Sequence, residues 1–327
     1  MMTREQALQR WLSEDLGFTG CRIEPASADA SFRRYFRVFH NGDHQIVMDA
    51  PPDKEDCGPF IAVAGLLLDV GVNVPQVLRT DLAAGFLLLS DLGSTSYLSA
   101  LNERTVDRLY GDALGALAAI QGCAAHDHLP PYDRALLDRE LRLFTDWLVG
   151  THCGIALEDD LKAALEHLFS LLIDNALEQP RVCVHRDYHS RNLMVVEGHN
   201  PGILDFQDAV SGPVTYDLVS LLRDCYIAWP RARVEAWALG YRELALQSGI
   251  LRPAEADEAR FLRWFDLMGV QRHLKAAGIF ARLLHRDGKT GYLKDIPRTL
   301  GYVTEVSSRY EALRPLAGLV ERVLARL

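Results

Sequence analysis

The sequence HRDYHSRN at residues 185–192, followed by DFQD at residues 205–208, is the most informative feature of this chain. Asp187 is followed by Asn192 and then by Asp205, and the residues between the last two contain two short runs with the pattern of β-strands. A polar turn after a strand would account for HRD alone, because such residues are common in turns. It would not account for D-x-x-x-x-N, two strand-like runs and D-F-x-D in this order. The spacing therefore predicts two loops that flank a hairpin and carry oxygen-bearing side chains.

These side chains are the set that a phosphoryl-transferring enzyme needs. We expect Asp187 to be the general base that accepts the proton of an acceptor hydroxyl. Asn192 and Asp205 are the expected Mg²⁺ ligands, since a hard cation prefers oxygen donors, with ATP phosphates and water completing its shell. A turn-forming role for Asp187 and a loop-capping role for Asn192 are the alternatives. Asp208 can equally contact a second metal ion or cap the next segment.

Composition limits the class of protein. The chain has 327 residues, 49% of them hydrophobic, which is enough for one large or two moderate domains. Its net charge of −9 disfavours nucleic-acid and anionic-membrane partners. No run approaches the ~20 apolar residues of a membrane span, and the start lacks the apolar region of a secretory signal. Six cysteines without C-x-x-C spacing indicate reduced thiols, so we expect a cytoplasmic protein of undetermined oligomeric state.

The pattern along the chain predicts a bilobal α+β architecture. The first lobe, residues 1–92, is expected to be rich in strands, and the second, residues 93–327, to be mainly helical apart from the strands around the motif. In the first lobe we predict helices at 3–16 and around 60–68, strands at 31–39, 45–49, 74–78 and 86–89, and a hairpin turn at 41–43. We interpret Glu55 as an acid in the first turn of the second of these helices.

With these motifs in place, the chain resembles the aminoglycoside phosphotransferase family, whose members are small-molecule kinases with the bilobal protein-kinase-like fold. The resemblance spans nearly the whole chain and is most specific from Val184 to Leu218. Asp217 matches the family's helix-opening Asp, which we expect to anchor the catalytic loop. The stretches VMDAPP at 47–52, FLLLSDLG at 86–93 and QRHLK at 271–275 resemble one subgroup, bacterial kinases that phosphorylate the anomeric hydroxyl of N-acetylmuramate and N-acetylglucosamine in cell-wall recycling.

The resemblance implies that the first lobe covers ATP. No Gly-rich loop is present, and no Lys occurs before Lys54, so the strand position that holds a phosphate-binding Lys in kinases is Met48 or a neighbour. Arg33, Arg34 and Arg37 are the candidates for neutralising the phosphates instead, with a solvated strand face as the alternative. The residues expected to contact the nucleotide are Ser31, Phe32, Arg33 and Arg34 near the phosphates and Ser90, Asp91 and Leu92 in the connector beside adenine.

The second lobe is expected to bind the acceptor, a small-molecule sugar. Burying its hydroxyl groups requires matched hydrogen-bond partners. The candidates are His189, Arg223, Gln271, Arg272 and His273, each of which has an ordinary surface role as its alternative. A kinase of an aminoglycoside, choline-like or homoserine-like alcohol is one rival prediction, although the basic 271–275 segment disfavours a polycationic acceptor. A non-catalytic nucleotide-binding protein is the other, and the absent strand Lys favours it.

Overall fold

A computed structural model describes residues 2–28, 32–255 and 257–327 of the protein. The chain forms two compact units, unit 1 from Met1–Thr95 and Met194–Asp208 and unit 2 from Ser96–Leu193 and Ala209–Leu327. The predicted division at residue 92 is a single cut, whereas the structure also places 194–208 in unit 1. This segment packs there because Ile203 N–H donates to Asn73 O at 2.8 Å and the Phe206 ring lies 4.9 Å from that of Phe60.

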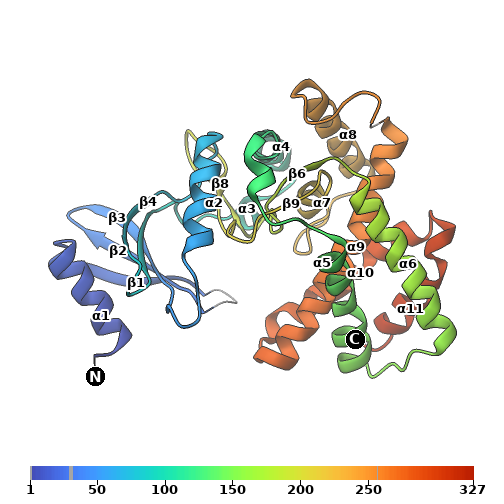
Figure 1. The fold of residues 1–327 in the computed structure, drawn as a ribbon, viewed down its shortest axis with the longest axis horizontal. Helices are drawn as coiled ribbons and strands as arrows, with labels where there is room; N and C mark the ends of the chain where they lie inside the picture. The colour runs from blue at the N-terminus through green and yellow to red at the C-terminus, as the bar shows by residue number, and fades with distance from the viewer. Residues whose placement is uncertain (1, 29–31, 256) are drawn as a thin grey trace. The chain divides into compact units, whose positions relative to one another are not determined.

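Unit 1 contains an antiparallel five-stranded sheet in the order β1-β2-β3-β5-β4 (Figure 1). The predicted hairpin turn lies between β2 and β3, where Asn41 and Gly42 take positive φ values of 53° and 90°. The elements of unit 1 are α1 (Arg4–Arg10) with a wider helical turn at Trp11–Asp15, β1 (Arg22–Ala28), β2 (Arg34–His40), β3 (Asp43–Asp49), α2 (Gly58–Asp69), β4 (Val77–Asp81), β5 (Phe86–Ser90) and β8 (Gly202–Ile203).

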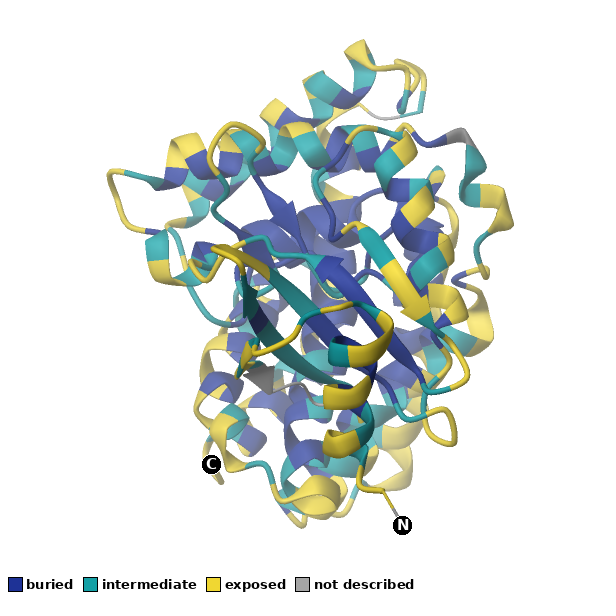
Figure 2. Cartoon of the chain, turned by 90° about the vertical axis from the view of Figure 1, so that its left-hand side faces the viewer, coloured by how far each residue is buried: buried dark blue, intermediate teal, exposed yellow. Residues whose placement is uncertain are grey.

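The core of unit 1 lies between α1 and one face of the sheet (Figure 2). A capping box at Thr3 and Gln6 starts α1, and Leu8 of this helix packs on the sheet together with Trp11 and Leu12 of the wider turn that follows. The core residues of the sheet are Val38, Val47, Phe86 and Leu88. Burial of these side chains is the main force that holds the helix on the sheet.

Unit 2 is mainly helical, as predicted, and its strands carry the HRDYHSRN loop (Figure 1). Strand β6 pairs antiparallel with β9, and β7 pairs with β8. Its helices are α3 (Tyr97–Ala100), α4 (Val106–Gln121), α5 (Arg134–Leu143), α6 (Asp159–Leu177), α7 (Tyr216–Leu222), α8 (Arg231–Gln247), α9 (Glu258–Asp287), α10 (Ile296–Ser307) and α11 (Arg314–Leu324). The remaining elements are β6 (Arg181–Val184), β7 (Leu193–Met194), β9 (Val210–Pro213) and short helical turns at Ala124–His128, Phe144–His152, Thr290–Asp295 and Glu311–Leu313.

Helix α9, with 30 residues, forms the centre of unit 2. It approaches the end of α5 so closely that a Cβ atom at Gly278 would lie 2.3 Å from the Leu143 carbonyl carbon. Only glycine permits this approach, and it brings polar residues of α5 and α9 into contact beneath the catalytic loop.

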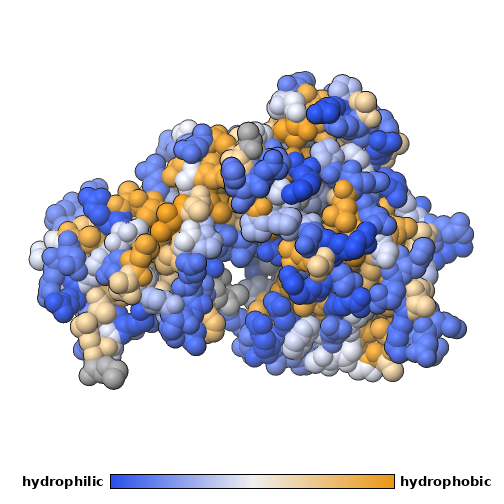
Figure 3. Space-filling view, viewed as in Figure 1, coloured by the Kyte–Doolittle hydropathy of each residue, from blue (hydrophilic) through white to orange (hydrophobic). Residues whose placement is uncertain are grey.

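The sequence pattern does not predict β1 or β9. Pro25 interrupts the apolar alternation of β1, and an edge strand tolerates it because one side needs no ladder hydrogen bonds. Strand β9 contains Gly212, where a Cβ atom would lie 2.9 Å from that of Tyr132. Hydrophilic residues cover most of the face shown in Figure 3, with hydrophobic residues interspersed among them. Within the described ranges, none of the helices combines the length and the apolar character needed to cross a membrane.

Candidate active site

The loop that follows β6 is held by the carboxylate of Asp217 in the first turn of α7. The backbone N–H groups of His185 and Arg186 donate to Asp217 at 2.6 and 3.0 Å, and Arg186 takes a positive φ of 77°. The predicted anchoring role of Asp217 is thereby confirmed. Burial raises the pKa of Asp217 to about 7, although the two N–H donors act in the opposite direction.

Asp187 follows Arg186 in this loop, and its side chain is half-buried. Burial alone would raise the pKa of Asp187, but positive charge on Lys275, together with His189 and Arg272, lowers it below the usual value. The group is therefore an ionised carboxylate at neutral pH, which is the protonation state that a general base requires.

Asn192 closes the same loop, because its Nδ2 donates to the Asp187 carbonyl oxygen at 3.0 Å. Any bond from this side chain to a cation would thus be made by its amide oxygen. Asp205 lies in unit 1, has a positive φ of 64°, and accepts a 2.8 Å hydrogen bond from Gln207. Both side chains offer the oxygen donors that Mg²⁺ prefers. Among the described residues, no three His, Cys, Asp or Glu side chains form a cluster that could hold a metal ion. The predicted pair of ligands would not form such a cluster, because Asn192 is an amide and only Asp205 is one of these residue types.

Beneath the loop, Glu140 of α5 is the centre of a buried polar cluster that sequence reasoning missed. Its carboxylate accepts from Arg186, lies 2.9 Å from Lys275 Nζ, and also accepts from Tyr132. Burial would raise the pKa of Glu140, but Lys275 and Arg186 lower it overall. Nothing in the local sequence marks Glu140, since its function in the cluster depends on partners brought together by α9 and β6.

The predicted acceptor residues separate into two groups. His189 and Arg272 both contribute to the electrostatic field at Asp187. Nδ1 of His189 is buried and makes no hydrogen bond to the residues that the structure describes, a state that a bound hydroxyl group would relieve. Gln271 belongs to the cluster around Glu140, because its Nε2 donates to the Glu140 carboxylate at 3.4 Å.

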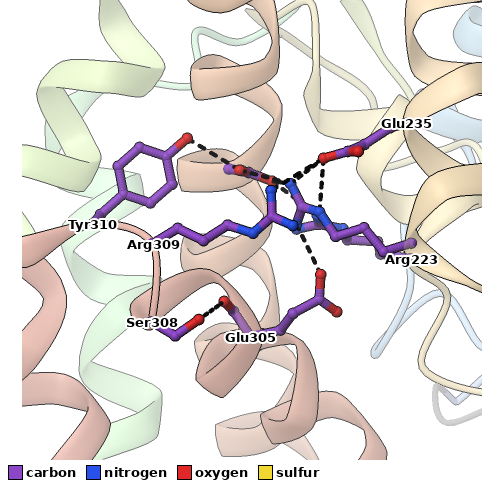
Figure 4. Close-up of polar contacts among 8 residues, drawn as sticks. Arg223, Glu235, Glu305, Ser308, Arg309 and Tyr310 are labelled. Carbon is purple, nitrogen blue, oxygen red and sulfur yellow. Dashed lines mark hydrogen bonds and ion pairs between the residues drawn. The ribbon is translucent and has the colours of Figure 1, made fainter.

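Arg223 belongs to a different network, part of which is drawn in Figure 4, and His273 is bonded to its backbone. Arg223 pairs with Asp266 at 2.8 Å, and Asp266 also pairs with Arg231. His273 Nε2 donates to the Arg223 carbonyl oxygen at 2.8 Å, and burial lowers the pKa of His273 to about 3. This placement favours a structural role for both, so they do not enter the acceptor site proposed below.

In unit 1, each of the three predicted phosphate-binding arginines pairs with a carboxylate. Arg34 shares the buried Asp49 with Arg4, and Arg37 pairs with Asp91. Arg33 Nε donates to Glu55 at 3.2 Å.

Glu55 does not lie where the sequence analysis predicts it. Helix α2 begins only at Gly58, so Glu55 precedes the helix and is not an acid of its first turn. It accepts hydrogen bonds from the Phe32 backbone N–H and from Arg33. The interpretation of Glu55 as a helix-dipole acid is therefore wrong, because its carboxylate binds the two residues that precede β2. Ser31, also predicted to contact the nucleotide, lies outside the described residues.

The predicted adenine connector, Ser90 to Leu92, begins at the last residue of β5. Ser90 Oγ accepts from the Gln76 backbone, and the Asp91 side chain is bound by Arg37 and by the Gly93 N–H. Both side chains thus have partners within unit 1.

Comparison with known proteins identifies relatives of the whole chain. The model of the Phosphotransferase enzyme family matches residues 22–262. The chain is 52% identical over 297 residues to an N-acetylmuramate/N-acetylglucosamine kinase of Pseudomonas aeruginosa, covering 90% of this chain and 87% of the relative. It is 44% identical to the protein of that name from Neisseria meningitidis, covering 98% and 96%.

Solved structures show the same fold. The GDP complex of aminoglycoside 2'-phosphotransferase-IIIa superposes with a TM-score of 0.61 at 16% identity, covering 94% of this chain and 99% of that one. An ethanolamine kinase of Plasmodium vivax gives a TM-score of 0.65 at 9% identity, with coverages of 90% and 85%. The predicted α+β, protein-kinase-like fold is confirmed.

Proposed function

The chain belongs to the Phosphotransferase enzyme family, and from this premise we propose that it is an ATP- and Mg²⁺-dependent kinase of N-acetylmuramate and N-acetylglucosamine. The phosphoryl group would be transferred to the anomeric hydroxyl. The single observation that carries the acceptor class is the high identity, over almost the full chain, to two kinases of that name. Because ATP is the donor, we place the reaction in the cytoplasm.

In this proposal Asp187 orients the acceptor hydroxyl and accepts its proton as the γ-phosphoryl group is transferred. The loop backbone anchored by Asp217 keeps Asp187 in position, and the basic groups around it keep it ionised. Preorganisation of this kind contributes to catalysis because no reorganisation is needed during the reaction.

Asn192 and Asp205 are the side chains that would hold Mg²⁺, which on binding neutralises charge on the ATP phosphates. We assign adenine to the connector residues Ser90, Asp91 and Leu92. Among Arg33, Arg34 and Arg37, Arg33 is the best candidate for binding the phosphates. Arg34 and Arg37 instead pair with the buried carboxylates of Asp49 and Asp91 in unit 1. An Arg33–Glu55 pair would then replace the Lys–Glu pair usual in kinases.

The groups around Asp187 also bear on the rival acceptors. The positive charges of Lys275, Arg272 and Arg186 act at Asp187, an environment that suits an anionic or neutral sugar and disfavours a polycationic aminoglycoside. His189 and Arg272 remain the candidates for acceptor hydroxyl groups, with Gln271 supporting the cluster below.

One observation favours a second candidate function, nucleotide binding without transfer. The strand position expected for Lys is the buried Met48, which pairs with Tyr35 across the hairpin. A screen of ATP consumption with N-acetylmuramate, N-acetylglucosamine, kanamycin and choline separates the possibilities. We expect ADP release only with the two amino sugars, and phosphorus NMR should show an anomeric phosphate. ATP binding without turnover for any acceptor would support the non-catalytic alternative instead.

A further inference from the structure

A partly exposed cluster lies beside the catalytic loop, made by Arg191, Tyr226, Phe280 and Tyr292. The Arg191 guanidinium carbon lies 3.6 Å from the centroid of the Tyr226 ring and 5.5 Å from that of Tyr292. The rings of Phe280 and Tyr292 stack at 5.6 Å, and Phe280 lies 6.3 Å from Tyr226. We call this group the Arg191 cluster. A guanidinium lying flat on a ring keeps its N–H groups in its own plane, directed away from the ring.

The charge of Arg191 is only weakly compensated. Its nearest carboxylate oxygen is that of Asp295 at 3.9 Å, which is longer than a hydrogen bond, and its side chain is 35% exposed. Asp295 also pairs with Arg298 at 3.3 Å, so one carboxylate faces two guanidinium groups. Arg298 in addition donates to the Cys225 carbonyl oxygen. Among the described residues, Arg191 therefore has no carboxylate at hydrogen-bond distance, and its partly exposed guanidinium can pair with a further anion.

Asp224 connects the Arg191 cluster to the catalytic loop. Its two carboxylate oxygens accept from the backbone N–H groups of Ser190 and Tyr226, both at 2.9 Å. The residue before Arg191 and the ring beneath Arg191 are thus held by the same side chain. The Asp187 carbonyl oxygen accepts from the His189 N–H at 3.0 Å in the same turn, so the backbone that carries Arg191 is joined to that of the proposed base.

The two proposed acceptors differ in one group that this arrangement can recognise. N-acetylmuramate carries a lactyl ether with a carboxylate on C3, whereas N-acetylglucosamine has a hydroxyl there. A sugar with its C1 hydroxyl at Asp187 presents the C3 substituent one ring width away. A guanidinium binds a carboxylate with two parallel hydrogen bonds, and an adjacent tyrosine ring can pack on the apolar face of a pyranose.

We propose that Arg191, supported by Tyr226, is the residue that selects acceptors bearing a carboxylate and so favours N-acetylmuramate over N-acetylglucosamine. This inference rests on the proposed function, since it requires both sugars to be substrates. It assigns to the chain a specificity determinant that acts on binding of one acceptor and not on the chemical step.

The test is a comparison of kcat/KM for the two sugars in the Arg191→Gln variant. Loss of a charge-assisted pair should lower kcat/KM for N-acetylmuramate by about 10- to 100-fold, mainly through KM, with that for N-acetylglucosamine nearly unchanged. In Arg191→Lys, kcat/KM for N-acetylmuramate should fall by a smaller factor, because Lys keeps the charge but cannot form two parallel hydrogen bonds. Arg286→Ala, which removes an exposed guanidinium paired with Asp287 at the end of α9, is the matched control and should change neither value.

The outcomes separate the inference from the function on which it rests. If the wild-type protein phosphorylates both sugars and Arg191→Gln leaves the ratio of their kcat/KM values unchanged, the inference is overturned and the proposed function stands. If the wild-type protein phosphorylates neither sugar, both are overturned. Melting curves of the variants establish that the comparison is made between folded proteins.

Discussion

Lys275 Nζ lies 2.9 Å from Glu140 Oε1, with both side chains at least nine-tenths buried. The same lysine donates to the Tyr216 hydroxyl at 2.8 Å, and the same glutamate binds Arg186 of the catalytic loop. Lys275 of α9 and Glu140 of α5 thus connect these two helices to the loop that carries Asp187. Since a buried charge is costly without its partner, loss of either residue should disturb the loop.

Removing one charge of this pair should destabilise the protein. Glu140→Gln leaves Lys275 and Arg186 without their shared carboxylate, and we expect a loss of about 3–5 kcal/mol in the free energy of unfolding. Urea denaturation followed by circular dichroism measures it. The double variant Glu140→Gln/Lys275→Met should recover part of the loss, because one unpaired charge is removed. A double variant as unstable as the sum of the single ones would show that the two residues are not coupled.

Asp187→Asn should greatly slow transfer while the affinity for ATP stays the same. The amide cannot accept the acceptor's proton, so we expect kcat to fall by about 10²- to 10⁴-fold. Coupled ADP release measures kcat, and calorimetric titration with ATP measures binding. Asp138→Asn, in a half-exposed pair with Arg142 on α5, is the control and should retain full activity. Phosphorylation at the wild-type rate by Asp187→Asn would exclude Asp187 as the base.

Arg33→Ala and Arg34→Ala should have different effects. If Arg33 binds the phosphates, its removal raises the Michaelis constant for ATP about tenfold or more, as expected for a hydrogen bond to a charged group. Arg34→Ala instead leaves the buried Asp49 with Arg4 as its remaining arginine, and should lower the melting temperature. Initial rates over a series of ATP concentrations and thermal melting distinguish the two. Equal Michaelis constants in wild type and Arg33→Ala would mean that another group neutralises the phosphates.

The buried His273 predicts a loss of stability in acid. Burial depresses its pKa from 6.5 to about 3, so the folded state favours the neutral ring. The unfolded chain takes up a proton first as the pH falls below 6.5, and folding stability is therefore lost between these two values. Melting temperatures of wild type and His273→Gln should converge as the pH falls, because the variant lacks this penalty. The exposed His167→Gln serves as the control, and parallel pH profiles for wild type and His273→Gln would contradict the assignment.

Much of unit 1 can be predicted because its signals are local. The turn at Asn41 and Gly42 requires positive φ values that these residue types adopt easily, and the flanking strands follow from their alternation. Strand β1 has no such signal, since Pro25 breaks its pattern and only pairing with β2 makes it a strand. The assignment of 194–208 to unit 1 likewise depends on contacts with residues far away in the sequence, such as that between Phe60 and Phe206.

The fold family, the type of reaction and the three residues proposed for its chemistry can be predicted from the residues of one motif, because this motif is short and its spacing is set by one hairpin. Which charged residue meets which partner depends on contacts between elements far apart in the chain. Arg223 and His273 look like acceptor residues in the chain but form a network with Asp266, while Glu140 and Arg191 gain their environment from distant helices. The physical reason is that a charged side chain takes its role from the groups it is buried with, and sequence distance carries no information about them.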